Sequence, residues 1–90
     1  IKILLLEDDL ILSDILIYHL EQNNFNVIHV NNGEDALKEA YSYKFDLMIL
    51  DINVPQKSGL EVLNDLRTNY NTTPIIVVTA YQSTQYMKNS

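Results

Sequence analysis

The ninety-residue sequence contains no cysteine, which excludes disulfide bonds and metal sites built from thiolates. It has only two glycines and two prolines, and no glycine-rich or proline-rich stretch marks a linker. With 47% hydrophobic residues, the chain is too apolar for intrinsic disorder. We therefore expect residues 1–90 to fold as one domain without internal repeats.

Basic residues are also scarce, because six lysines and arginines stand against twelve acidic residues and give a net charge of −6. This charge disfavours direct binding to nucleic acid or to an anionic membrane, and it suits a site that attracts cations. No apolar run approaches the roughly 18 residues of a membrane span, and the initial apolar run is too short for a signal peptide. A cytoplasmic protein is the expectation.

Four short aliphatic runs have the length and composition of β-strands. Their apolar residues are continuous rather than alternating, which is typical of strands that are covered on both faces in a parallel sheet. The runs occupy residues 1–6, 25–30, 45–50 and 74–80.

The segments between these runs have the three- and four-residue apolar spacing of amphipathic helices. We expect helices over residues 10–22, 34–43 and 59–69, with another beginning near residue 83. Asp9 and Asn32 are expected to cap the first two, and Ser58 with Glu61 has the spacing of a capping box. The residues expected to face the core are Leu12, Ile15, Leu16 and Leu20, then Ala36, Leu37, Ala40 and Tyr41, then Leu60, Leu63, Leu66 and Tyr70.

Strict alternation of strand and helix predicts an open α/β fold with a parallel sheet and right-handed crossovers. In such folds ligands bind beyond the carboxyl ends of the strands. Glu7 and Asp8 follow the first strand, Asp51 ends the third, and Thr79 lies at the end of the fourth. We therefore expect a pocket of carboxylates with a hydroxyl beside it.

Crowded carboxylates raise one another's pKa and are costly unless a cation is present. Oxygen ligands without cysteine or a nearby histidine suit a hard ion, and Mg²⁺ fits because it takes only one or two carboxylates and keeps several waters. The alternative is structural: each acid also suits a turn, and Thr79 suits an ordinary strand position. His19 and His29 are expected on a helix surface and at a strand end, with no metal partner.

The segments "ILLLEDD", "DLMILDINVPQKSGLEVLNDLR" and "PIIVVTA", at their spacings, closely resemble the receiver domains of two-component response regulators. The resemblance covers essentially the whole chain. It implies a three-layer, flavodoxin-like, doubly wound sheet of strand order 2-1-3-4-5, and a domain that accepts a phosphoryl group from a histidine kinase or phosphotransfer protein. Such a domain assists its own modification and is not an enzyme that turns over a substrate.

The resemblance also implies roles for individual residues. Asp51 matches the phosphoacceptor and a metal ligand, Asp8 a direct Mg²⁺ ligand, and Glu7 a ligand acting through water. Asn53 matches the position whose backbone carbonyl binds the metal. Thr79 matches the hydroxyl that bonds a phosphoryl oxygen, and Ala80 matches the small residue beside it.

The sequence departs from the family where the chain stops, because the fifth strand, the fifth helix and the lysine that pairs with the phosphoryl group are missing. We expect a truncated domain of strand order 2-1-3-4 that belongs to a longer regulator with an output domain. The fourth strand would then be an exposed edge that favours self-association. The first helix would have a partly exposed apolar surface that includes Leu10, Ile11, Ile17 and Tyr18.

Three other functions are alternatives to a phosphorylated receiver. A pseudo-receiver that only binds proteins is compatible with the missing lysine, and Lys57, on a loop near the pocket, is not assigned that role. An aspartate-nucleophile phosphohydrolase would need a second acid where Asn53 stands. A flavodoxin would need a phosphate-binding loop after the first strand, where this chain has acids.

Overall fold

The computed structural model describes residues 1–54 and 57–78. Strands and helices alternate through this part of the chain, as predicted, and their ends differ only slightly from the expected ones. The elements are β1 (Lys2–Leu6), α1 (Leu10–Gln22), β2 (Asn26–Val30), α2 (Gly33–Ser42), β3 (Leu47–Asp51), α3 (Gly59–Thr68) and β4 (Ile75–Val78). The helix expected from residue 83 lies outside the described residues.

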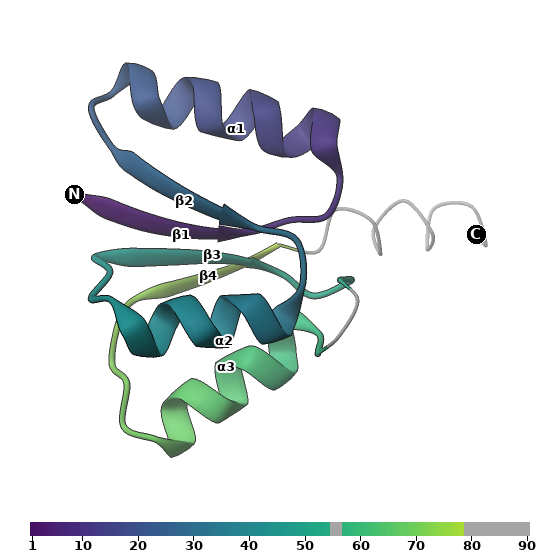
Figure 1. The fold of residues 1–90 in the computed structure, drawn as a ribbon, viewed down its shortest axis with the longest axis vertical. Coiled ribbons are helices and arrows are strands. Elements are labelled where there is room, and N and C mark those ends of the chain that lie inside the picture. The colour runs from purple at the N-terminus through teal and green to yellow at the C-terminus, as the bar shows by residue number, and fades with distance from the viewer. Residues whose placement is uncertain (55–56, 79–90) are drawn as a thin grey trace.

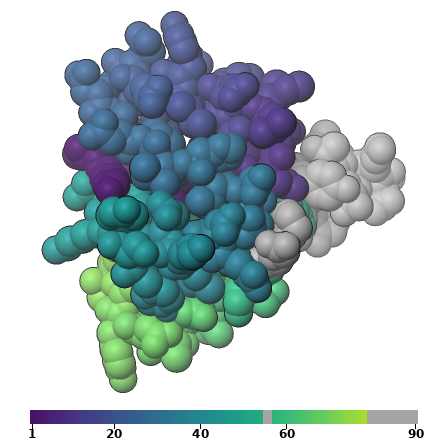
Figure 2. Space-filling view, viewed as in Figure 1, coloured from purple at the N-terminus to yellow at the C-terminus, as the bar shows by residue number. Residues whose placement is uncertain are grey.

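The four strands form one parallel sheet in the order β2-β1-β3-β4, which confirms the predicted topology. Figure 1 shows α1 on one face of this sheet and α2 with α3 on the other, so the domain has three layers. In the space-filling view α1 forms one flank of the molecule, and the helices of the opposite layer form the other (Figure 2). No helix in residues 1–54 and 57–78 is long and apolar enough to cross a membrane.

The central strand β1 is the most deeply buried element, because it has a strand on each side and helices on both faces. Leu4 and Leu6 are fully buried and belong to the core cluster beneath α2 and α3. Side chains alternate along a strand, so Ile3 and Leu5, which are equally buried, face the α1 layer. Covering on both faces explains why the run is continuously apolar.

The predicted helix caps are confirmed. The carboxylate of Asp9 accepts from the backbone N–H groups of Ile11 and Leu12, at 3.0 and 3.1 Å, at the start of α1. Asn32 caps α2, and Ser58 with Glu61 forms the capping box that begins α3. These side chains satisfy backbone donors that have no partner inside the helix.

The predicted inward face of α1 is partly wrong. Ile15 is half exposed, whereas Ser13 is fully buried on the neighbouring part of the helix surface. The Ser13 hydroxyl donates to the Leu10 carbonyl at 3.1 Å, so burying it leaves no unpaired hydroxyl. A small residue also lets the helix approach the sheet closely, and the larger Ile15 lies to the side.

The predicted face of α3 is wrong at two positions, because Leu60 and Tyr70 are exposed. The helix instead turns Gly59, Val62 and Leu66 inward. Gly59 explains this rotation: a Cβ there would collide with the backbone carbonyl of Asp51, so only glycine permits the helix start to pack against the end of β3.

The predicted face of α2 is confirmed for its buried alanines, but Tyr41 is half exposed. Its ring lies at the margin between α2 and α3, where its hydroxyl donates to the carboxylate of Asp65. Tyr41 therefore links the two helices of this layer instead of filling the core.

Apolar residues remain exposed at β4 and on α1. Within the described residues β4 is the last strand of the sheet, and Ile76 on it is 52% exposed. Leu10, Ile11 and Tyr18 of α1 are exposed, as predicted, while Ile17 is partly buried. An apolar strand at a sheet edge is a template for pairing with another chain.

We predict that the ninety-residue chain self-associates through β4. Sedimentation at tens of micromolar should show dimers or larger species, and Ile76→Lys should shift the population toward monomer, because a charge on an edge strand opposes pairing. Leu60→Lys, at a similarly exposed apolar residue on α3, is the matched control and should leave association unchanged. A monodisperse monomer of the unmodified chain would contradict the prediction.

Candidate metal centre

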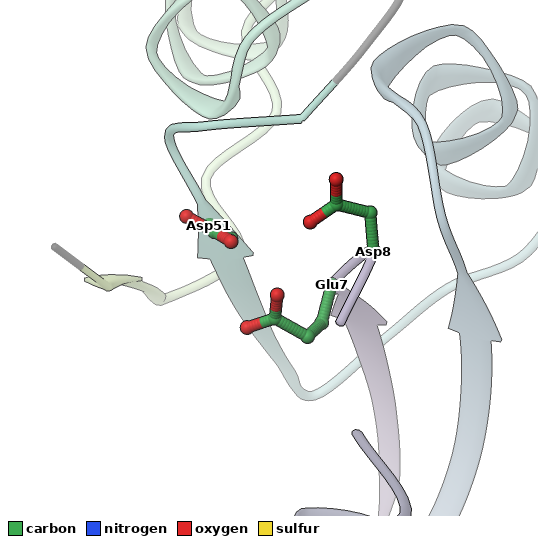
Figure 3. A group of neighbouring side chains, drawn as sticks. All are labelled: Glu7, Asp8 and Asp51. Carbon is green, nitrogen blue, oxygen red and sulfur yellow. The ribbon is translucent and has the colours of Figure 1, made fainter. Parts of the chain in front are cut away.

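Three acidic side chains meet where β1 and β3 end. Glu7 and Asp8 directly follow β1, and Asp51 is the last residue of β3. Because these strands are paired in parallel up to Leu6 and Leu50, the residues that follow emerge side by side. One carboxylate oxygen from each acid lies within 4.8 Å of the others, and Figure 3 shows the three side chains around one space. The predicted convergence is confirmed.

The three acids differ in their exposure to solvent. Glu7 and Asp51 are 3% and 7% exposed, whereas Asp8 is exposed. Two of the three carboxylates in this acid pocket therefore belong to buried residues, and the third belongs to a residue exposed to solvent.

Burial and neighbouring negative charge hold a proton on Glu7. Removal from water raises the pKa of Glu7 to about 7, and a hydrogen bond with the Asp51 side chain and the charges of Asp51 and Asp8 add to the rise. The Asp9 backbone N–H donates to Glu7 Oε2 at 3.2 Å, and this hydrogen bond offsets only part of the rise in the pKa of Glu7. When Glu7 is protonated, the repulsion between the acids is lower than when all three are charged.

The residues of the pocket fit a Mg²⁺ ion. The donors are hard carboxylate oxygens, which Mg²⁺ prefers, and the exposed position of Asp8 leaves room for the waters that the ion retains. Burial raises the pKa of Glu7, and the charges of Asp51 and Asp8 add to the rise, so a divalent cation beside these acids would stabilise the charged form of Glu7. The crowding is thus a property of the folded chain, not of the sequence pattern alone.

The loop after β3 holds Asp51 in place. The Asn53 backbone N–H donates to Asp51 Oδ1 at 3.0 Å, a side-chain turn that orients the carboxylate. Gly59 packs against the Asp51 backbone from the other side, so α3 buttresses the end of the strand. The sequence signals were a glycine after a polar loop and an asparagine two residues beyond the acid.

Asn53 also carries a buried polar atom, which sequence patterns do not predict. Its side-chain Nδ2 is buried and, among the described residues, finds no hydrogen-bond partner. An unpaired buried donor costs about 1–3 kcal/mol, so it is retained most easily where a ligand supplies the acceptor.

Two other acidic or basic residues near the pocket have structural roles. Asp9 caps α1, as predicted, and its side chain is not in the acid cluster. Lys57 is exposed and has a positive φ of 75°. Its backbone carbonyl lies where a Cβ on Gly33 would be, so the Lys57 backbone packs against the start of α2. Thr79 and Ala80, also predicted at this rim, lie outside the described residues.

His29 is a neighbour of the pocket that sequence reasoning missed. It lies on β2, opposite Leu5 of β1, and its Nε2 is 2.8 Å from the backbone carbonyl oxygen of Glu7. Only the pairing register of the two strands reveals this contact, and no spacing in the sequence encodes it.

A flavodoxin-like parallel sheet with an acid pocket at the carboxyl ends of its central strands defines a receiver-type α/β domain. The chain belongs to the response regulator receiver domain family, whose model matches residues 3–90.

Known proteins similar to this chain include response regulators. It is 45% identical over 83 residues to the transcriptional regulatory protein CiaR of Streptococcus pneumoniae, covering 92% of this chain and 37% of CiaR. The response regulator TrrA of Thermotoga maritima, solved with Mg²⁺ and BeF, is 34% identical with a TM-score of 0.80, covering 91% of this chain and 74% of that one. The structure of TrrA in complex with the histidine kinase ThkA matches at 38% identity and a TM-score of 0.81, covering 89% of this chain and 69% of that one.

The chain spans about a third to two fifths of the length of the curated relatives it matches, which include CiaR and a regulator of alkaline phosphatase synthesis from Bacillus subtilis. These relatives are named as transcriptional regulators. What the whole relatives do is thus a guide to a longer protein and not a property of this domain.

The raised pKa of Glu7 predicts a pH-dependent effect of Glu7→Gln on stability without metal. An acid whose pKa rises on folding stabilises the fold at low pH, and that stabilisation is lost as pH rises from 4.5 to about 7. Glutamine mimics the protonated acid, so Glu7→Gln should raise the free energy of unfolding at pH 8 by about 1–3 kcal/mol, and by clearly less at pH 5.

Urea denaturation in a chelating buffer measures this difference. Asp14→Asn, which removes an exposed acid of α1 outside the cluster, is the control for lowering the net charge. Equal effects of the two substitutions at pH 8 would show that general charge, and not the pocket, is responsible.

Proposed function

We propose that this domain accepts a phosphoryl group from a histidine kinase onto Asp51, with Mg²⁺ held by the acid pocket, and thereby controls an output. The observation that supports this most strongly is the convergence of Glu7, Asp8 and Asp51 at the carboxyl ends of β1 and β3. Membership of the receiver family supports phosphoryl transfer as the type of chemistry.

The pocket residues have distinct proposed roles. Asp51 is the nucleophile and also a metal ligand, Asp8 binds Mg²⁺ directly, and Glu7 acts through a bound water. The backbone carbonyl of Asn53 is the remaining protein ligand. When bound, Mg²⁺ neutralises charge on the acids and on the phosphoryl oxygens, which otherwise repel one another.

The proposed reaction transfers the phosphoryl group in line. A carboxylate oxygen of Asp51 forms a bond to phosphorus while the bond from phosphorus to the donor histidine nitrogen breaks. That nitrogen keeps the electron pair of the broken bond and the imidazole becomes neutral after proton exchange with solvent. The chain contributes a fixed carboxylate, because the Asn53 N–H and the packing of Gly59 limit the rotation of Asp51.

Other parts of the site bear on the phosphoryl oxygens. The buried Nδ2 of Asn53 is a donor without a partner among the described residues, and we propose that it donates to a phosphoryl oxygen. We also propose the Thr79 hydroxyl as a donor to the phosphoryl group and Ala80 as the small residue that leaves it room.

The proposed partners follow from the relatives. The complex of TrrA with ThkA is a precedent for a histidine kinase as phosphoryl donor. The curated relatives are longer and are named as transcriptional regulators, so an output domain is proposed beyond this one. With its acidic charge this domain itself is not expected to bind nucleic acid or membrane. A cytoplasmic location fits such a regulator.

The proposal is tested by incubating the chain with Mg²⁺ and a small acyl-phosphate donor and measuring the intact mass. We expect a single phosphoryl adduct that hydroxylamine removes, because an acyl phosphate is labile to that nucleophile. The adduct should be absent in Asp51→Asn and after chelation of Mg²⁺.

Asp14→Asn is the matched control, since it removes an exposed acid of α1 outside the cluster and should leave the adduct unchanged. An adduct that persists in Asp51→Asn would contradict the assignment of the acceptor. If neither this chain nor one extended by a fifth strand and helix is modified, the alternative of a protein-binding module without phosphorylation is favoured.

A further inference from the structure

Two backbone atoms of Glu7 form hydrogen bonds with residues of β2. Its N–H donates to the carbonyl of Val30 at 3.0 Å, and its carbonyl accepts from the ring of His29 at 2.8 Å. The first bond is a main-chain contact that any residue at position 30 supplies. The second depends on the side chain at position 29, so it is a feature of this sequence.

The contact fixes a peptide group that joins two residues of the acid pocket. The Glu7 carbonyl belongs to the planar peptide between Glu7 and Asp8, so holding its oxygen sets the plane from which the Asp8 side chain leaves the backbone. A carbonyl can only accept, and His29 Nε2 must therefore carry the hydrogen.

The contact between His29 and Glu7 lies just beyond the end of β1. β1 ends at Leu6, so Glu7 lies past the last residue of the strand and has fewer backbone partners to hold it. His29 pairs with Leu5 and its ring reaches two residues further along the neighbouring strand. The imidazole thus adds a contact between β2 and the residues that follow β1, where Glu7 and Asp8 lie.

We infer that His29 is a positioning residue that holds the Glu7–Asp8 peptide and so preorganises the pocket for Mg²⁺; this rests on the metal site of the proposed function. The ring does not touch the ion in this account. It acts through the backbone, and a side chain that donates from a similar place should replace it.

The inference predicts separate effects of donor loss and packing loss on Mg²⁺ affinity. His29→Leu removes the donor, and the Mg²⁺ dissociation constant should rise about three- to tenfold, as expected for one lost hydrogen bond. His29→Gln offers an amide donor at a similar reach and should stay within about twofold of the unmodified chain. Val27→Ala is the control, since Val27 lies two residues earlier on the same face of β2.

Amide chemical shifts of Glu7, Asp8 and Asp51 during Mg²⁺ titration give the dissociation constants, and urea denaturation verifies that each variant is folded. A long-range ¹H–¹⁵N spectrum of the unmodified chain reads the tautomer directly, whatever the variants do. We expect the Nε2–H form; the Nδ1–H form would overturn the inference, even if His29→Leu did not fold.

Two further outcomes separate this inference from the proposed function. In the first, the unmodified chain binds Mg²⁺, but the dissociation constant of His29→Leu is within about twofold of the unmodified value, or His29→Gln binds as weakly as His29→Leu. Either result would overturn the role of His29 alone. Failure of Mg²⁺ to bind the unmodified chain would contradict the metal site, and the inference with it.

Discussion

The parallel pairing of β1 with β3 is the constraint on which the site depends. It brings Glu7 and Asp8 beside Asp51, although more than forty residues separate them in the chain, and the buried leucines of β1 keep the register. A shift of one residue would turn the apolar side chains of a strand to the opposite face. The packing of the core therefore fixes the geometry of the acids, and the acids contribute nothing favourable to that packing.

Without a cation, the burial and crowding of the acids lower the stability of the fold as pH rises toward 7 and beyond. Two of them are buried, and the repulsion is lowered by keeping a proton on Glu7, whose pKa is about 7. In the proposed function, Mg²⁺ would displace the proton of Glu7 near neutral pH. Gly59 packs against the Asp51 backbone, the Asn53 N–H donates to the Asp51 carboxylate, and the His29 ring contacts the Glu7 carbonyl, so the acids on both strands have neighbours that anchor them.

Much of this arrangement could be predicted from the sequence, because the signals were local. Strand runs, helix caps and acids at strand ends each depend on neighbouring residues, and the family resemblance supplied the strand order. The inward faces of α1 and α3 were predicted less well, since burial of Ser13 and exposure of Leu60 depend on how each helix rests on the sheet. The contact of His29 with Glu7 depends on strand register, which no spacing reveals. The roles of individual residues toward Mg²⁺ and phosphate remain proposals.

The central claim is that Glu7, Asp8 and Asp51 form one pocket in which a proton and Mg²⁺ compete. Calorimetric titration of the chain with Mg²⁺ at pH 7, in two buffers of different ionisation enthalpy, measures the protons released on binding. Because the pKa of Glu7 is about 7, binding should release a fraction of a proton, and the heats should differ between the buffers accordingly. No Mg²⁺ binding, or identical heats in both buffers, would contradict the account.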